Sequence, residues 1–191
     1  MNVSIHRAVQ SGFLMIEVLI TMFILVIGLL GVVGLQARAQ QAETESYQRT
    51  QALILLRDMA DRINANRNNA ATYVTTTPLG TGNDLTVCAA PANTVEMDKC
   101  AWSAALIGAA ETTGTCNVST GANCVGAMIG ARGCVTQLDA VNRIYLIEVV
   151  WQGLSPTATP PASIDCGINL YGAEELRRAV TTIVQIGDLG T

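Results

Sequence analysis

Apolar residues are distributed very unevenly along this chain. A dense apolar block begins at Phe13, and Val18 to Leu35 form 18 consecutive uncharged residues in which only Thr21 is polar. At about 1.5 Å per residue, a helix of roughly 20 such residues crosses the hydrocarbon core of a bilayer. The pattern therefore predicts that residues 13–35 form a membrane-spanning helix.

Residues 36–66 keep the helix-forming composition but become amphipathic. Apolar residues recur here at helical spacing, namely Ala52, Leu56, Met59 and Ile63. Two i,i+4 ion pairs with the acid first are also predicted, Glu45–Arg49 and Asp58–Arg62. We expect one continuous helix from about Leu14 to Asn64, apolar on all sides in its first half and packed against a domain in its second half.

Residues 67–191 are predicted to form a globular α+β domain. Poor periodicity over residues 70–125 indicates loops, with one short helix around Met97–Ala110. Three later segments have the pattern of strands, namely Ala127–Leu138, Asn142–Trp151 and Arg178–Ile186. We expect these strands to form a small antiparallel sheet that packs on the amphipathic half of the long helix.

The domain contains six cysteines, namely Cys88, Cys100, Cys116, Cys124, Cys134 and Cys166. An even number in loop-rich sequence after a membrane segment favours disulfides in an oxidising compartment, and reduced cysteines in a cytosolic domain are the alternative. Sequence does not select the pairing. A preference for short loops favours Cys88–Cys100 and Cys116–Cys124, which leaves Cys134–Cys166 to join the strand region to the last long loop.

Charge and motifs argue against several functions. The net charge is −4, so no phosphate-binding surface and no nucleic-acid partner are predicted. The single histidine, His6, precedes the apolar block, and the chain has no C-x-x-C pair, P-loop or G-x-S-x-G motif. We therefore expect no enzyme, no metal and no cofactor. The acids Asp58, Asp61, Glu174 and Glu175 are interpreted as solvated charges.

The N-terminal residues 1–12 differ from a secretory signal. The small residue Gly12 precedes the apolar block, so cleavage after it would leave the helix on the mature chain. Arg7 favours a cytoplasmic N-terminus. Glu17 places a carboxylate at the start of the apolar helix, where a charge is costly and is a functional candidate. The alternative is an interfacial glutamate that water or headgroups satisfy.

The segment from Gly12 to Leu19, GFLMIEVL, resembles the motif of type IV prepilins, the class III signal peptide. The resemblance implies that residues 1–12 are a leader removed between Gly12 and Phe13 by a prepilin peptidase, and that Phe13 is N-methylated. It also implies that Glu17 meets the positively charged amino terminus of a neighbouring subunit, which repays part of its desolvation. Leu14 and Met15 depart mildly from the family pattern, which more often has threonine or serine and then leucine.

Three glycines recur in the apolar half, namely Gly28, Gly31 and Gly34. Glycine is ordinarily tolerated in membrane helices. The resemblance to pilins allows a second interpretation, in which the glycines soften the helix during assembly, since each costs about 1 kcal/mol relative to alanine.

The C-terminal part is similar to minor pilins of the PilV type in Tyr145–Gly153, Cys166-Gly167 and Arg177–Val180. Together the resemblances imply a minor pilin of a type IV pilus with a pilin-like α+β fold. The implied partners are other pilins and minor pilins, the inner-membrane assembly platform and the lipid bilayer. The implied location is the bacterial inner membrane with a periplasmic domain, and later the pilus. A type II secretion pseudopilin and an adhesin-like tip module are the alternatives.

Overall fold

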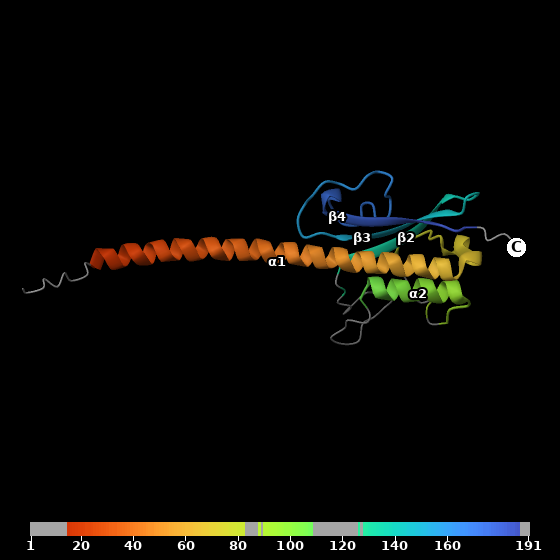
Figure 1. The fold of residues 1–191 in the computed structure, drawn as a ribbon, viewed down its shortest axis with the longest axis horizontal. Coiled ribbons are helices and arrows are strands. Elements are labelled where there is room, and N and C mark those ends of the chain that lie inside the picture. The colour runs from red at the N-terminus through yellow and green to blue at the C-terminus, as the bar shows by residue number, and fades with distance from the viewer. Residues whose placement is uncertain (1–14, 83–87, 89, 109–125, 127, 188–191) are drawn as a thin grey trace, which may run out of the picture. The chain divides into compact units, whose positions relative to one another are not determined.

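The computed structural model describes the chain apart from residues 1–14, 83–87, 89, 109–125, 127 and 188–191 (Figure 1). The chain divides into two units, residues 1–43 and residues 44–191. Helix α1 (Met15–Ala65) contributes residues to both. Its bounds lie within one residue of those predicted, because the apolar block and the amphipathic segment lack any helix-breaking proline.

The first unit contains the apolar part of α1. All residues from Met15 to Glu43 are exposed, including large side chains such as Leu30, which is 67% exposed. In the described part of the chain, α1 is the one helix whose length and composition suit a membrane span. A helix that is apolar on every side is stable when lipid or other helices surround it.

In the second unit, α1 packs through the predicted apolar stripe. Ala52, Met59 and Ile63 are fully buried, and Leu56 is nearly so. The stripe extends one turn further back than expected, to Gln48. Burial of these side chains gives the hydrophobic contribution that holds the helix against the sheet.

The sheet has four antiparallel strands in the order β1-β2-β3-β4, namely β1 (Leu79–Gly80), β2 (Ile129–Asp139), β3 (Ile144–Gln152) and β4 (Arg177–Gln185). The last three agree with the predicted strands to within two residues. Asp139 stabilises the turn between β2 and β3, because its Oδ1 accepts from the amide of Asn142 at 2.9 Å.

Strand β1 was not predicted because two residues are too short to show alternation. Its Gly80 has a φ of +99°, and a side chain there would place Cβ 2.5 Å from the carbonyl oxygen of Ala131. Only glycine fits this close approach to β2.

The two faces of β3 have different surroundings. Tyr145, Ile147, Val149 and Trp151 alternate along β3 and are buried in the core together with residues of α1. Glu148 lies on the opposite face. Residues 153–176 connect β3 to β4 and are called the strap below. Part of the strap packs on that opposite face, because Cys166 and Tyr171 form a second cluster with Cys134 and Val150.

Helix α2 (Thr94–Leu106) lies alongside α1 in the second unit (Figure 1). It begins three residues before the predicted start because the Asn93 side chain caps it by accepting from the amide of Glu96 at 3.0 Å. It also ends earlier than predicted, two residues before Gly108, which adopts a φ of +73°. The buried Trp102 donates to the carbonyl of Leu55 in α1 at 2.8 Å.

Candidate assembly site

The candidate assembly residues lie in or next to the first turn of α1. Glu17 is in that turn and is exposed, between the exposed apolar side chains of Ile16 and Val18. An acid in the first turn interacts favourably with the helix dipole, but lipid would still impose a desolvation cost on its charge. Gly12 and Phe13 lie outside the described residues, so cleavage and methylation stay predictions.

The remainder of the apolar half is compatible with a nonpolar environment. Thr21 donates its hydroxyl to the carbonyl of Val18 at 2.9 Å, which satisfies the one polar side chain between Val18 and Leu35. Helix α1 continues without a break through Gly28, Gly31 and Gly34. A Cβ at any of these glycines would meet nothing within 4 Å. Among the described residues, no contact requires glycine at these positions, and the proposed softening stays a prediction.

At the start of the second unit, α1 is tied to the far end of the chain. Glu45 was expected to pair with Arg49, and this prediction is wrong. Its Oε1 lies 3.3 Å from the guanidinium of Arg178 on β4 and accepts from the amide of Leu154 at 3.2 Å. The sheet brings these donors to Glu45, so a tertiary contact replaces the local pair.

A polar network holds the other end of α1. The predicted Asp58–Arg62 pair is present at 3.0 Å, and Arg62 also reaches Asp98 of α2 at 2.9 Å. The hydroxyl of Tyr73, in the 3₁₀ helix η1 (Arg67–Tyr73), donates to Asp98. Burial and this bond raise the pKa of Tyr73 to about 12. Asp58 is therefore a paired charge and not simply a solvated one.

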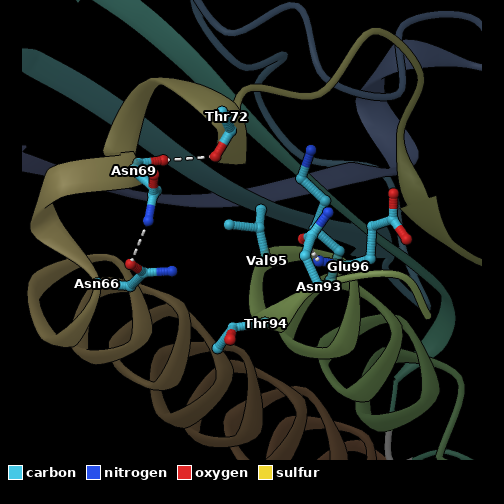
Figure 2. Close-up of a pocket in the computed structure, with 8 residues that line it drawn as sticks. Asn66, Asn69, Thr72, Asn93, Thr94, Val95 and Glu96 are labelled. Carbon is cyan, nitrogen blue, oxygen red and sulfur yellow. Dashed lines mark hydrogen bonds between the residues drawn. The ribbon is translucent and has the colours of Figure 1, made fainter.

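Beside this network lies a polar pocket of about 440 Å³. Figure 2 shows Asn66, Asn69 and Thr72 on one side of it and residues 93–96 from the start of α2 on the other. Several lining groups bond one another: Asn69 donates to Asn66 at 2.8 Å, and Thr72 donates to the carbonyl of Asn69 at 2.6 Å. These contacts close the loop after α1, and they leave few polar groups to direct toward a ligand.

Two disulfides stabilise the described part of the second unit. Cys88–Cys100 joins the segment before α2 to that helix, with Cα atoms 5.5 Å apart. Cys134–Cys166 joins β2 to the strap, with Cα atoms 5.9 Å apart. Both are among the pairs favoured from the sequence, and Cys116–Cys124 lies outside the described residues.

The strap is also held by a buried cation. Arg177 is 3% exposed and donates to the carbonyls of Ile164 at 2.9 Å and Cys166 at 3.1 Å. Its Nε lies 2.6 Å from the carboxylate of Glu174, which accepts from the amide of Asn169 at 2.7 Å. The interpretation of Glu174 as a merely solvated charge is wrong. Both interactions lower its pKa, the Asn169 amide most.

The acid in the middle of β3 is the most unusual group of the sheet. Glu148 is fully buried, and neither of its oxygens has a hydrogen-bond partner among the described residues. Burial raises its pKa to about 7. An oxygen of Glu148 and the sulfurs of Cys134 and Cys166 lie within 4.8 Å of one another. Because the two sulfurs are bonded to each other, they offer no thiolate to a metal.

Helix α1 is apolar in its first part, with an acid in its first turn, and its second part packs on a four-stranded antiparallel sheet. This combination is the fold class of the type IV pilins. A comparison with protein families agrees with this class. Residues 34–141, which are 108 of the 191 residues, match the Tt1218-like family, described as Type IV pilin Tt1218. The chain therefore belongs to this family. Comparisons with curated proteins and with solved structures gave no match.

Family membership indicates a structural protein that interacts with other pilins. The matched region extends from the end of the apolar half of α1 through β2. The prepilin motif around Gly12 and the PilV-like residues of β3 and β4 lie outside it.

Proposed function

We propose that this chain is a minor pilin of a type IV pilus, inserted into the filament through its first helix. The observation that carries the proposal is the apolar part of α1, in which every residue from Met15 to Leu35 is exposed and Glu17 is the only charge. Such a surface needs other helices or lipid around it. The positively charged amino terminus of a neighbouring subunit would offset part of the desolvation free energy of the Glu17 carboxylate. This pairing would also fix the register of the helices.

The same N-terminal segment also indicates how the chain is processed. We infer that a prepilin peptidase removes residues 1–12, that Phe13 is N-methylated, and that the subunit waits in the bacterial inner membrane with its domain in the periplasm. The assembly platform in that membrane then transfers it to the pilus. The support for these steps is the Gly12-Phe13 motif and the apolar helix that follows it.

The test replaces the acid and compares it with a matched control. Glu17→Ala and Glu43→Ala each remove one exposed carboxylate from α1. Both should be cleaved to the same mature mass, because neither alters Gly12 or Phe13. Glu17→Ala should be depleted at least about tenfold from sheared pili while remaining in the membrane, because a lost buried pair costs several kcal/mol. Glu43→Ala should be incorporated like the unmodified chain. Normal incorporation of Glu17→Ala would refute the assembly role.

A pseudopilin of a type II secretion system is the second candidate, since it would use the same leader and helix. The family match to a type IV pilin favours the pilus. Two measurements separate the candidates. In the unmodified strain, a pilus subunit should be recovered with sheared pili, whereas deletion of the gene for a pseudopilin should abolish protein secretion.

A further inference from the structure

We propose that the strap is a pH-sensitive latch that closes over Glu148 when this carboxyl carries a proton and loosens when the proton is lost. The inference concerns the folded domain alone and goes beyond the proposed role in assembly. It stands whether or not the chain enters a pilus.

Glu148 is the pH-sensing group of the latch, because of where it lies in the sheet. On β3 it lies between Cys134 of β2 and Thr181 of β4, on the sheet face away from α1. Its side chain is fully buried and both oxygens lack a hydrogen-bond partner among the described residues. Burying a neutral carboxyl without a partner costs a modest amount of free energy, whereas burying an unpaired carboxylate costs much more.

The strap covers Glu148 and is anchored to the sheet. Cys166 is 3% exposed and is bonded to Cys134, the residue directly across from Glu148. Tyr171 anchors the strap at a second point, because its hydroxyl donates to the carbonyls of Gly130 at 2.9 Å and Val150 at 3.2 Å. Hydration of Glu148 therefore requires the strap to move away from the sheet at Tyr171, within the reach that the disulfide to Cys134 allows.

The groups around Glu148 together favour its protonated form. The strap presents Asp165, a like charge that adds to the effect of burial and raises the pKa of Glu148. The backbone amide of Cys166 lies close enough to lower the pKa of Glu148, although it makes no well-formed hydrogen bond with either oxygen, and the charge of Arg177 also lowers this pKa. Arg177 is only a partial counter-ion, because it already binds Glu174 and two strap carbonyls. The balance leaves Glu148 with a pKa of about 7.

In the part of the chain that the structure describes, no residue of the other neighbouring elements forms an ion pair with Glu148. From β2, Arg132 lies two residues before Cys134, and its guanidinium stacks 5.0 Å from the centre of the Tyr171 ring. Tyr171 keeps its proton, because burial raises its pKa. From β4, the residue opposite Glu148 is the uncharged Thr181. Helix α1 packs on the other face of the sheet.

The sign of the effect follows from linkage. A carboxyl whose pKa is higher in the closed form than in water favours closure at low pH. Closure is fully favoured below the ordinary pKa near 4.5 and weakens as the pH rises to about 7. Allowing for partial hydration of the site, we expect the open fraction to increase about tenfold between about pH 5.5 and about pH 8.

The Cys134–Cys166 disulfide reports opening directly. The full-length protein in mild detergent is treated with a phosphine reductant that acts across this pH range. The reaction is quenched with acid at several times, and reduction of each disulfide is measured by mass spectrometry. Dividing the rate for Cys134–Cys166 by that for Cys88–Cys100 in the same molecule removes the pH dependence of the reagent. This ratio should rise about tenfold from about pH 5.5 to about pH 8.

Two variants complete the test. Glu148→Gln keeps the shape of a protonated carboxyl and should make the ratio independent of pH. Asp165→Asn removes the like charge and should lower both the midpoint and the size of the rise. A constant ratio in the unmodified protein, or an unchanged rise in Glu148→Gln, would overturn the latch. An unchanged midpoint in Asp165→Asn would contradict the electrostatic part of the inference.

Discussion

Removal of each disulfide should destabilise the domain by an amount set by the loop that it closes. Cys134–Cys166 closes a loop with a sequence separation of 32, whereas Cys88–Cys100 closes one of 12. Loop-closure entropy at about 25 °C corresponds to about 3.7 kcal/mol for the first and about 2.8 kcal/mol for the second. The two loops do not overlap, so the two losses should be additive.

Packing enlarges this difference. Cys134 and Cys166 are buried and cluster with Val150 and Tyr171, whereas Cys88 and Cys100 are half-buried. Replacing both residues of the strap disulfide by alanine therefore also leaves a small cavity. We expect a loss of about 4 kcal/mol for Cys134→Ala with Cys166→Ala, and about 3 kcal/mol for Cys88→Ala with Cys100→Ala.

Urea unfolding of the full-length protein in detergent measures both values. The two tryptophans, Trp102 and Trp151, are buried in the second unit, so their fluorescence reports unfolding of that unit. The midpoint should fall further for the strap pair with little change in slope. Equal losses, or a larger loss for the Cys88–Cys100 pair, would refute the reasoning from loop length and burial.

Two further predictions concern the contacts of α1. Met59→Ala should destabilise the domain by about 2–5 kcal/mol in the same urea assay, because the side chain is fully buried, whereas the matched Ile54→Ala, at a side chain 52% exposed, should cost less than about 1 kcal/mol. Similar losses for these two variants would contradict the assignment of the buried stripe. Tyr73→Phe should cost about 1–3 kcal/mol because Asp98 loses a donor, and an ultraviolet absorbance titration should show one phenol fewer ionising at high pH than in the unmodified protein. An unchanged number of phenols that titrate at high pH would contradict the assignment of a raised pKa to Tyr73.

Much of the fold was predictable because it depends on neighbours close in sequence. Hydrophobic period and the absence of proline defined α1 and its buried stripe, and alternation located β2, β3 and β4. The motif around Gly12 and Glu17 is equally local, which is why the resemblance to prepilins is visible in the sequence. Local capping was available too, but the signal of Asn93 and Glu96 for the start of α2 was missed.

The partners of the charged groups required the tertiary structure. Glu45 binds Arg178, which lies 133 residues away, in preference to Arg49 one turn away. Glu174 pairs with an arginine whose burial depends on the path of the strap. Glu148 follows the alternation of β3 and lies on its outer face, yet nothing in the strand predicts that the strap covers it.

The sequence by itself thus determined the elements and the apolar segment with its lone acid, because periodicity and composition act over a few residues. Only the tertiary structure decided which charges are paired and which are buried. The free energy of a charge depends on its solvation and on groups brought near it by chain folding, and neither is encoded in spacing along the chain.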